Sequence, residues 1–199
     1  MIVFSIIVSY LIGSIPTGYW ISRLKGIDVR QHGSGNLGAT NVFRVLGKPA
    51  GIVTLVVDAL KGVICVTWIA YLFANSHINL DWLRVLNGFA AIIGHNWTIF
   101  LKFKGGKGVA TSAGIIIGLE PYAFLICLII FLILVSLTRI VSIGSLSTAL
   151  ALPIIFIWKH EPLPQLIFAL VASILVIYRH KENIKRIWLG KEFKIGQKS

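Results

Sequence analysis

Long apolar runs constrain the fold of this chain more than any other feature of its sequence. A membrane-spanning helix needs about 20 mostly apolar residues. Runs of about that length are Ile2–Ile21, Ala50–Ala74, Leu83–Leu101, Pro121–Leu137, Val141–Trp158 and Leu163–Tyr178. Only 13% of the residues are charged, whereas soluble domains carry about a quarter. The first run lacks the basic flank and cleavage site of a signal peptide. We therefore predict an all-α integral membrane protein, with one membrane-embedded domain over residues 1–199.

A seventh apolar run, Val109–Leu119, is too short to cross alone, at about 16 Å for 1.5 Å per residue. The basic residues favour a crossing there, because cytoplasmic loops are enriched in Lys and Arg. With seven crossings, 16 of the 19 Lys and Arg residues lie on the cytoplasmic side of the membrane. The exceptions are Lys61, Arg84 and Lys159. We predict seven transmembrane helices, with the amino terminus outside and the carboxy terminus cytoplasmic. Irregular backbone would complete the short helix, buried in protein or beside a wet cavity.

The charge balance narrows the classes of partner. The sequence has 19 basic and 7 acidic residues, a formal net charge of +12. In a chain this apolar, that excess favours anionic lipid headgroups or phosphate substrates over nucleic acid. Cys65 and Cys127 lie inside apolar runs, which argues against a disulfide, a cysteine metal site and a thiol nucleophile. We expect neither a metal nor a cofactor.

The first polar motif is Gly33-Ser-Gly-Asn-Leu-Gly-Ala-Thr-Asn-Val-Phe-Arg44. Its glycines allow successive backbone N–H groups to face an anion, and its arginine offers a fork that suits phosphate. The predicted phosphate-binding residues are Ser34, Gly35, Asn36, Thr40, Asn41 and Arg44. The spacing also matches G-x-G-x-x-G, but no buried strand precedes it, so a dinucleotide fold is rejected. The alternative is an ordinary glycine-rich turn between two spans.

The second polar motif is Phe103-Lys-Gly-Gly-Lys-Gly-Val-Ala-Thr-Ser112, which opens a helix. A helix amino terminus favours an anion. We predict Lys104 as a catalytic residue, and the predicted phosphate-binding residues are Gly105, Gly106, Lys107 and Thr111. The alternative is a basic loop whose charges only fix topology. His95, upstream, is either a packed residue or a catalytic one, and its place in a membrane favours the second.

Three further features are open to two interpretations each. Asp58 and Lys61 lie three apart in the second span, where a neutralising structural pair is favoured over a functional one. Around Thr138-Arg-Ile-Val-Ser142, Ser142 is a catalytic candidate and Arg139 a phosphate-binding one, although serines here also pack helices. Residues 179–199 form a predicted cytoplasmic amphipathic tail attracted to anionic lipid. On one face of it His180 and Asn183 are placed to bind phosphate.

These motifs, with Gly94-His and with Arg179-His-Lys-x-Asn-Ile…Arg186…Gly190…Glu192, resemble bacterial acyl-phosphate:glycerol-3-phosphate acyltransferases, the PlsY family. The resemblance covers essentially the whole chain. One departure is Trp97-Thr98, where the family usually has an aromatic residue followed by proline. The resemblance implies acyl transfer from acyl phosphate to the sn-1 hydroxyl of glycerol 3-phosphate, giving lysophosphatidate. It also implies a bacterial inner-membrane location, a cytoplasmic active site and a soluble partner enzyme that makes the acyl phosphate.

The residues are compatible with a direct displacement. No His-x-x-x-x-Asp pair is present and no cysteine is placed to form a thioester. Phosphate is itself a good leaving group, so basic side chains and backbone N–H groups are sufficient to position both phosphates and stabilise developing charge. The base would be His95 or a phosphate oxygen of the substrate. The alternative function is a transporter of small phosphorylated anions, although the polar motifs crowd one membrane face and no inverted repeat is visible. A scaffold without a site would leave three polar motifs unexplained.

Overall fold

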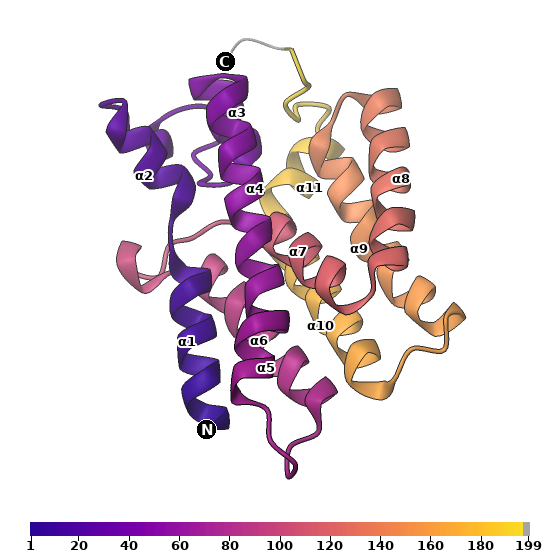
Figure 1. Cartoon of the computed structure of the whole chain (residues 1–199). Coiled ribbons are helices and arrows are strands. Elements are labelled where there is room, and N and C mark those ends of the chain that lie inside the picture. Colours follow the sequence, from indigo (N-terminus) through magenta and orange to yellow (C-terminus); the bar gives the residue numbers. More distant parts are fainter. Residues whose placement is uncertain (197–199) are drawn as a thin grey trace. The chain divides into compact units, whose positions relative to one another are not determined.

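The computed structural model describes residues 1–196, and every regular element in that range is helical (Figure 1). The described part of the chain divides into two compact units, residues 1–119 and residues 120–196. The one membrane-embedded domain expected over residues 1–199 remains a prediction. Residues 197–199 of the predicted tail lie outside the described part of the chain.

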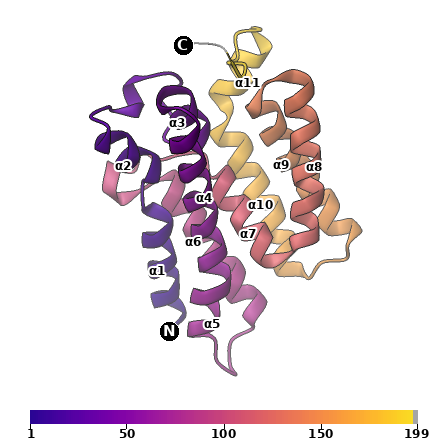
Figure 2. The same cartoon turned by 45° about the horizontal axis from the view of Figure 1, so that its top comes forward.

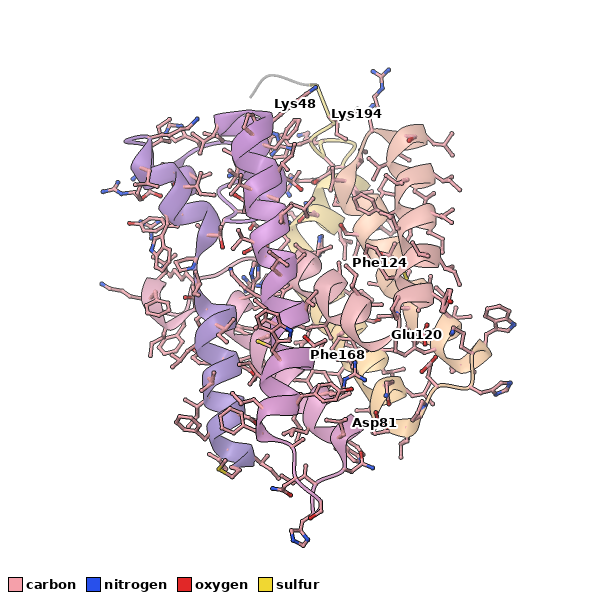
Figure 3. All side chains as sticks on the ribbon, viewed as in Figure 1. Lys48, Asp81, Glu120, Phe124, Phe168 and Lys194 are labelled. Atoms are coloured by element: carbon pink, nitrogen blue, oxygen red, sulfur yellow. The ribbon has the colours of Figure 1, made fainter. Side chains whose placement is uncertain are left out.

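The first unit is built around two pairs of packed helices, α1 against α6 and α4 against α7. Its helices are α1 (Ile2–Ser14), α2 (Thr17–Leu24), α3 (Ala39–Leu46), α4 (Lys48–Ile64), α5 (Ala70–Phe73), α6 (Leu80–Asn96) and α7 (Val109–Leu119). Short 3-10 turns cover Val29–Gln31 and Ile99–Leu101, and a π-helical segment, Cys65–Ile69, joins α4 to α5. Within this unit, Lys48 and Asp81 lie at opposite ends of the helices (Figure 3).

The first predicted span is broken in the middle. Helix α1 ends at Ser14, Ile15 leaves the helical conformation (φ −55°, ψ 113°), and α2 begins at Thr17. Pro16 explains the break, because proline has no N–H to donate to the preceding turn and restricts the residue before it. The continuous helix expected over Ile2–Ile21 is therefore two helices, and the second runs on to Leu24.

Glycines bring helix backbones into direct contact at two crossings. A Cβ atom at Gly13 would overlap the backbone of Ala91, where α1 crosses α6. One at Gly62 would overlap the Thr111 carbonyl oxygen, and one at Gly114 that of Ala59, where α4 crosses α7. Small residues permit this approach in membrane helices. The first turns of the short helix α7 are thereby held against the last turns of α4 (Figure 2).

Arg84 of α6 joins the π-helical segment after α4 to the end of α7. Its Nε donates to the Val66 carbonyl, 3.0 Å away in the π-helical segment, and its Nη2 donates to the Gly118 carbonyl at the end of α7. A π-helical turn and a helix end both leave carbonyl groups without partners in their own helix. One half-buried guanidinium therefore satisfies two elements at once.

The second unit packs α8 (Pro121–Thr138) against α9 (Val141–Trp158) and α9 against α10 (Leu163–Arg179). Glu120 caps α8 by accepting from the Tyr122 N–H at 3.2 Å. The hydroxyl of Ser173 donates to the Ala149 carbonyl at 2.5 Å and joins α10 to α9. Helix α11 (Lys181–Trp188) follows α10 at an angle of 59°. This eight-residue helix lies within the predicted tail, whose amphipathic, cytoplasmic character remains a prediction.

Several helices are long and apolar enough to cross a membrane. Among the described residues there are four, Ile2–Leu24, Lys48–Phe73, Pro121–Thr138 and Val141–Trp158, and the bent pair Leu163–Arg179 with Lys181–Trp188 would make a fifth. Helix α6 has 17 residues and α7 has 11. A multi-pass membrane protein is therefore supported, while the count of seven crossings and their orientation remain predictions.

Candidate active site

The first polar motif folds around the side chain of Asn41, which is 1% exposed. Its Nδ2 donates to the carbonyls of Val29, His32 and Asn36 at 3.1, 3.1 and 2.9 Å. Its Oδ1 accepts from the Ser34 N–H at 2.9 Å. Gly33 and Gly35 have φ values of +58° and +68°, which glycine adopts without strain. The sequence did not indicate that Asn41 holds the loop, and direct contact between Asn41 and phosphate remains a prediction.

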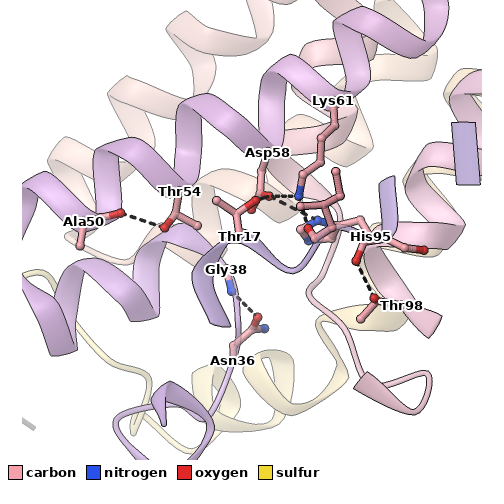
Figure 4. A network of polar contacts seen from close by, with 11 residues as sticks. Thr17, Asn36, Gly38, Ala50, Thr54, Asp58, Lys61, His95 and Thr98 are labelled. Carbon is pink, nitrogen blue, oxygen red and sulfur yellow. Dashed lines mark hydrogen bonds and ion pairs between the residues drawn. The ribbon is translucent and has the colours of Figure 1, made fainter. Parts of the chain in front are cut away.

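The other candidates of this motif lie around Asn41. The Asn36 Oδ1 accepts from the Gly38 N–H at 2.9 Å, immediately before α3 (Figure 4). Arg44 Nη1 lies 3.5 Å from the Asn41 Oδ1. Ser34 and Arg44 are half-buried and Thr40 is exposed. The motif therefore combines a rigid backbone with side chains that remain accessible, as an anion site requires.

The second polar motif turns back onto the end of α6. After the 3-10 turn, Lys102 and Phe103 have positive φ values of 52° and 60°, and the chain reverses. The N–H groups of Gly105 and Gly106 then donate to the carbonyls of Asn96 and His95, at 3.1 and 3.0 Å. A Cβ atom at either glycine would overlap His95 or Asn96. The two glycines are thus required by this close packing, whatever they bind.

The start of α7 gathers buried polar groups that have no partner. The side chains of Asn96, Thr111 and Ser112 are 0%, 0% and 6% exposed, and among the described residues none of them has a hydrogen-bond partner. Burying a polar group without a partner costs about 1–3 kcal/mol. Lys104 is exposed and Lys107 half-buried on the approach to this helix. The geometry thus offers unused donors, positive charge and a helix amino terminus in one segment.

A second group of buried polar residues lies on α4 and α6 and at the break between α1 and α2 (Figure 4). The predicted pair is confirmed: Lys61 Nζ lies 2.5 Å from Asp58 Oδ1, with side chains 4% and 3% exposed. The same Oδ1 accepts from the Thr17 hydroxyl at 3.0 Å and lies 3.9 Å from His95 Nδ1. We call Thr17, Asp58, Lys61 and His95 the Asp58 cluster.

A small cavity joins this cluster to both motifs. Its lining includes Asp58 and His95, Leu37 from the first motif and Gly106 from the second. It has room for about one water molecule. Within the first unit, one residue from each glycine-rich motif and His95 thus line the same cavity, while the roles predicted for the site residues remain predictions.

The remaining candidates meet in the second unit around Glu192. Its Oε1 accepts from the Ser142 hydroxyl at 3.0 Å and from the Asn183 Nδ2 at 2.6 Å. Its Oε2 accepts from the Arg186 Nε at 2.6 Å. We call these four residues the Glu192 cluster. Glu192 and Arg186 were not among the predicted site residues. The available signal was the position of Glu192, which is one of two carboxylates in the basic tail and comes directly after the Gly190-Lys turn.

Arg139 and His180 lie elsewhere in the second unit. Arg139 ends α8 with a φ of 59°, its side chain is exposed, and its carbonyl accepts from the Ile195 N–H at 2.8 Å. His180 is 3% exposed, with its Nδ1 2.7 Å from the Val176 carbonyl. The phosphate-binding roles of both residues remain predictions.

Known proteins resemble this chain over almost its full length. The model of a family described as Glycerol-3-phosphate acyltransferase matches residues 3–190. A glycerol-3-phosphate acyltransferase of Rippkaea orientalis is 47% identical and aligns over 97% of this chain and 92% of its own. Glycerol-3-phosphate acyltransferase 2 of Moorella thermoacetica is 45% identical over 98% of each chain.

Two crystal structures of PlsY, an integral membrane glycerol 3-phosphate acyltransferase, have the same fold. The glycerol 3-phosphate form gives a TM-score of 0.92 at 37% identity and covers 98% of this chain and 96% of that one. The lysophosphatidic acid form gives 0.89 at 36% identity, over 98% and 95%. The chain therefore belongs to the glycerol-3-phosphate acyltransferase family and is a PlsY-type membrane enzyme.

Proposed function

We propose that the enzyme transfers an acyl group from acyl phosphate to the sn-1 hydroxyl of glycerol 3-phosphate. The products are 1-acyl-glycerol 3-phosphate and inorganic phosphate, and the reaction is the first membrane step of phospholipid synthesis. The observation that carries this proposal is the segment before α7, where buried donors without partners meet Lys104 and Lys107. The names of the related crystal structures support the acceptor and the product.

The reaction is a single displacement. The acceptor hydroxyl oxygen attacks the acyl carbon, the bond from that carbon to the phosphate oxygen breaks, and phosphate leaves with the electron pair. Lys104, Lys107, Arg44 and those backbone N–H groups of the two motifs that do not already donate within the protein position the phosphates and stabilise the developing charge. The hydroxyl proton passes to His95 or to a phosphate oxygen. For the second unit the proposal keeps the roles that the sequence predicts, with Ser142 as a catalytic residue and Arg139, His180 and Asn183 as phosphate-binding residues.

The setting of the reaction is part of the proposal. The enzyme works in the bacterial inner membrane with its active site on the cytoplasmic side, and a soluble enzyme supplies the acyl phosphate. Basic residues support this orientation. They lie at one end of the first unit, where α2, α3 and the start of α4 are found (Figure 1).

The deciding experiment measures phosphate release from palmitoyl phosphate by purified protein, with and without glycerol 3-phosphate. Release that requires glycerol 3-phosphate, with lysophosphatidate formed one for one, is the expected result. Release without acceptor would instead indicate a hydrolase or a covalent acyl-enzyme. No release, together with glycerol 3-phosphate flux into liposomes, would favour the transporter.

Two variants test the roles of individual residues. Lys104→Ala should lower kcat more than a hundredfold, about 2.7 kcal/mol, if the ammonium contacts charge in the transition state. Lys102→Ala is the matched control, because Lys102 is an exposed lysine two residues earlier. His95→Ala distinguishes the two bases: a loss of only a few fold would exclude histidine as an essential base.

A further inference from the structure

The break between α1 and α2 is closed by side chains from other parts of the first unit. The Thr98 hydroxyl donates to the Ser14 carbonyl at 2.5 Å, and Lys61 Nζ donates to the Ile15 carbonyl. Inside a membrane, a carbonyl group without a partner costs several kcal/mol. Lys61 therefore has a backbone partner as well as Asp58, and it is the second donor to the Ile15 carbonyl, which also accepts from the Thr17 N–H at 3.0 Å.

Asp58 contributes more than the neutralisation of Lys61. A structural ion pair on one helix needs only its two members, three residues apart. Here the Asp58 Oδ1 also accepts from the first residue of α2, Thr17, at 3.0 Å and faces the His95 Nδ1 at 3.9 Å. A buried carboxylate is costly unless several donors surround it. One oxygen atom thus connects α4 to α2 and to the end of α6.

His95 lies between this carboxylate and the glycine-rich segment. Its Nδ1 faces Asp58, while its Nε2 lies so close to Gly106 that a Cβ atom there would overlap it. A separation of 3.9 Å is too long for a direct hydrogen bond. The cavity beside both side chains has room for one water molecule, which would bridge such a gap.

We propose that Asp58 is a positioning residue for acyl transfer: through a bridging water it fixes the His95 imidazole with Nδ1 protonated, and Nε2 then holds the segment between Lys104 and Lys107. The inference rests on the proposed function only in taking that segment as the phosphate site. The charged side chains recorded next to His95 are Asp58, 3.9 Å from its Nδ1, and Lys61, which pairs with Asp58. Lys104 and Lys107 flank the glycines that pack on its ring, and the other charges of α4 and α6 (Lys48, Asp81 and Arg84) lie at least two turns of helix away from Asp58 or His95 in sequence. Among the groups next to His95, only Asp58 is an acceptor for the Nδ1 proton.

The test has a spectroscopic arm and a kinetic arm, both on the full chain in lipid bilayers. Histidine is labelled with ¹⁵N, and the signal of His95 among the five histidines is identified by its absence in His95→Gln. We expect the wild type to show the Nδ1-protonated tautomer and Asp58→Asn to show a different or mixed form. In the kinetic arm, Asp58→Asn should lower kcat about tenfold. Its effect should largely disappear in the His95→Gln background, because both changes interrupt one connection.

An unchanged His95 signal in Asp58→Asn, or full additivity of the two losses, would overturn the proposal. If Asp58→Asn does not fold, the double variant Asp58→Asn/Lys61→Met, which buries no charge at either position, takes its place in both arms. Asp81→Asn is the control, since Asp81 lies near the opposite end of α6 from His95. The spectroscopic arm needs no turnover, so it still gives a result if wild type fails to use palmitoyl phosphate.

Discussion

Each unit of the molecule contains a buried carboxylate that gathers polar side chains, and the two do so differently. Asp58 pairs with a lysine three residues away on the same helix, and that lysine is 4% exposed. Glu192 accepts from Ser142, 50 residues away, and pairs with Arg186, whose side chain is 28% exposed. The first carboxylate is part of the helix packing, so its loss should affect folding. The second closes the tail over the start of α9, so its loss should affect activity more than folding.

Lys61→Met tests the first half of this comparison and should have the largest effect. It leaves Asp58 buried without its cation, which costs about 3–5 kcal/mol, and it leaves the Ile15 carbonyl without the lysine. The midpoint of thermal unfolding in one detergent measures the loss. The double variant Asp58→Asn/Lys61→Met should recover much of it, because no uncompensated charge remains. Equal stability of Lys61→Met and wild type would show that the pair does not support the fold.

Glu192→Ala tests the second half. Ser142 and Asn183 lose their common acceptor, and we expect kcat to fall about tenfold or more, corresponding to at least about 1.4 kcal/mol. The unfolding midpoint should move less than in Lys61→Met, because Arg186 is partly exposed to water. Glu182→Ala, which removes an exposed carboxylate from α11, is the control. A large loss of stability with unchanged kcat would reverse the comparison.

Arg84→Met tests whether the stability of the first unit also depends on buried polar contacts outside the Asp58 cluster. The substitution leaves the Val66 and Gly118 carbonyls without the guanidinium. The expected loss is about 1–3 kcal/mol of unfolding free energy, measured in the same detergent. Arg23→Met, at an exposed arginine, should change nothing. If both variants unfold alike, the end of α7 does not need Arg84.

Asp28→Asn removes the carboxylate of an exposed ion pair, in contrast to the buried pair of Asp58 and Lys61. It should have the smallest effect on the free energy of unfolding. The Arg30 side chain, which donates to Asp28, lowers the pKa of that carboxyl from 3.8 to about 2. A lowered pKa means that the pair stabilises the folded state above about pH 4 and that this contribution is lost as the pH falls towards 2. At pH 7 the loss should be below about 1 kcal/mol, since Arg30 is 41% exposed. The difference between the unfolding midpoints of the two proteins should therefore be smaller at pH 3 than at pH 7, and it should vanish near pH 2.

The same contrast explains which parts of the site could be predicted. Two residues three apart on a helix face each other, so the Asp58–Lys61 pair was visible in the sequence. The Ser142–Glu192 contact was not, because it depends on how the chain turns after α11. Asn41 is predicted to bind phosphate, which stays a prediction; the contacts by which its buried side chain holds the loop had no signal in the sequence. His95 was placed correctly beside the second motif.

The helices themselves were predictable from the apolar runs, but their interruptions were not. The apolar composition of Ile2–Ile21 indicates one span. The signal for the break in that span was a single proline, at position 16. The positive φ values of Lys102 and Phe103 have no signal in the sequence, since neither residue type favours that conformation. They follow from the need to return the chain to the end of α6. Hydropathy measures length and apolar content, and neither identifies where a helix must stop to build a site.

The glycine contacts between α4 and α7 affect how this enzyme tolerates sequence change. Gly62 and Gly114 carry no chemistry, yet a side chain at either would separate the two backbones and move the start of α7. Random mutagenesis scored for lost activity should therefore recover substitutions at these glycines about as readily as at the lysines. Drift among the surrounding apolar residues would be nearly neutral. The segment before α7 can then vary only within limits set by two glycines whose role is to let α4 and α7 approach each other.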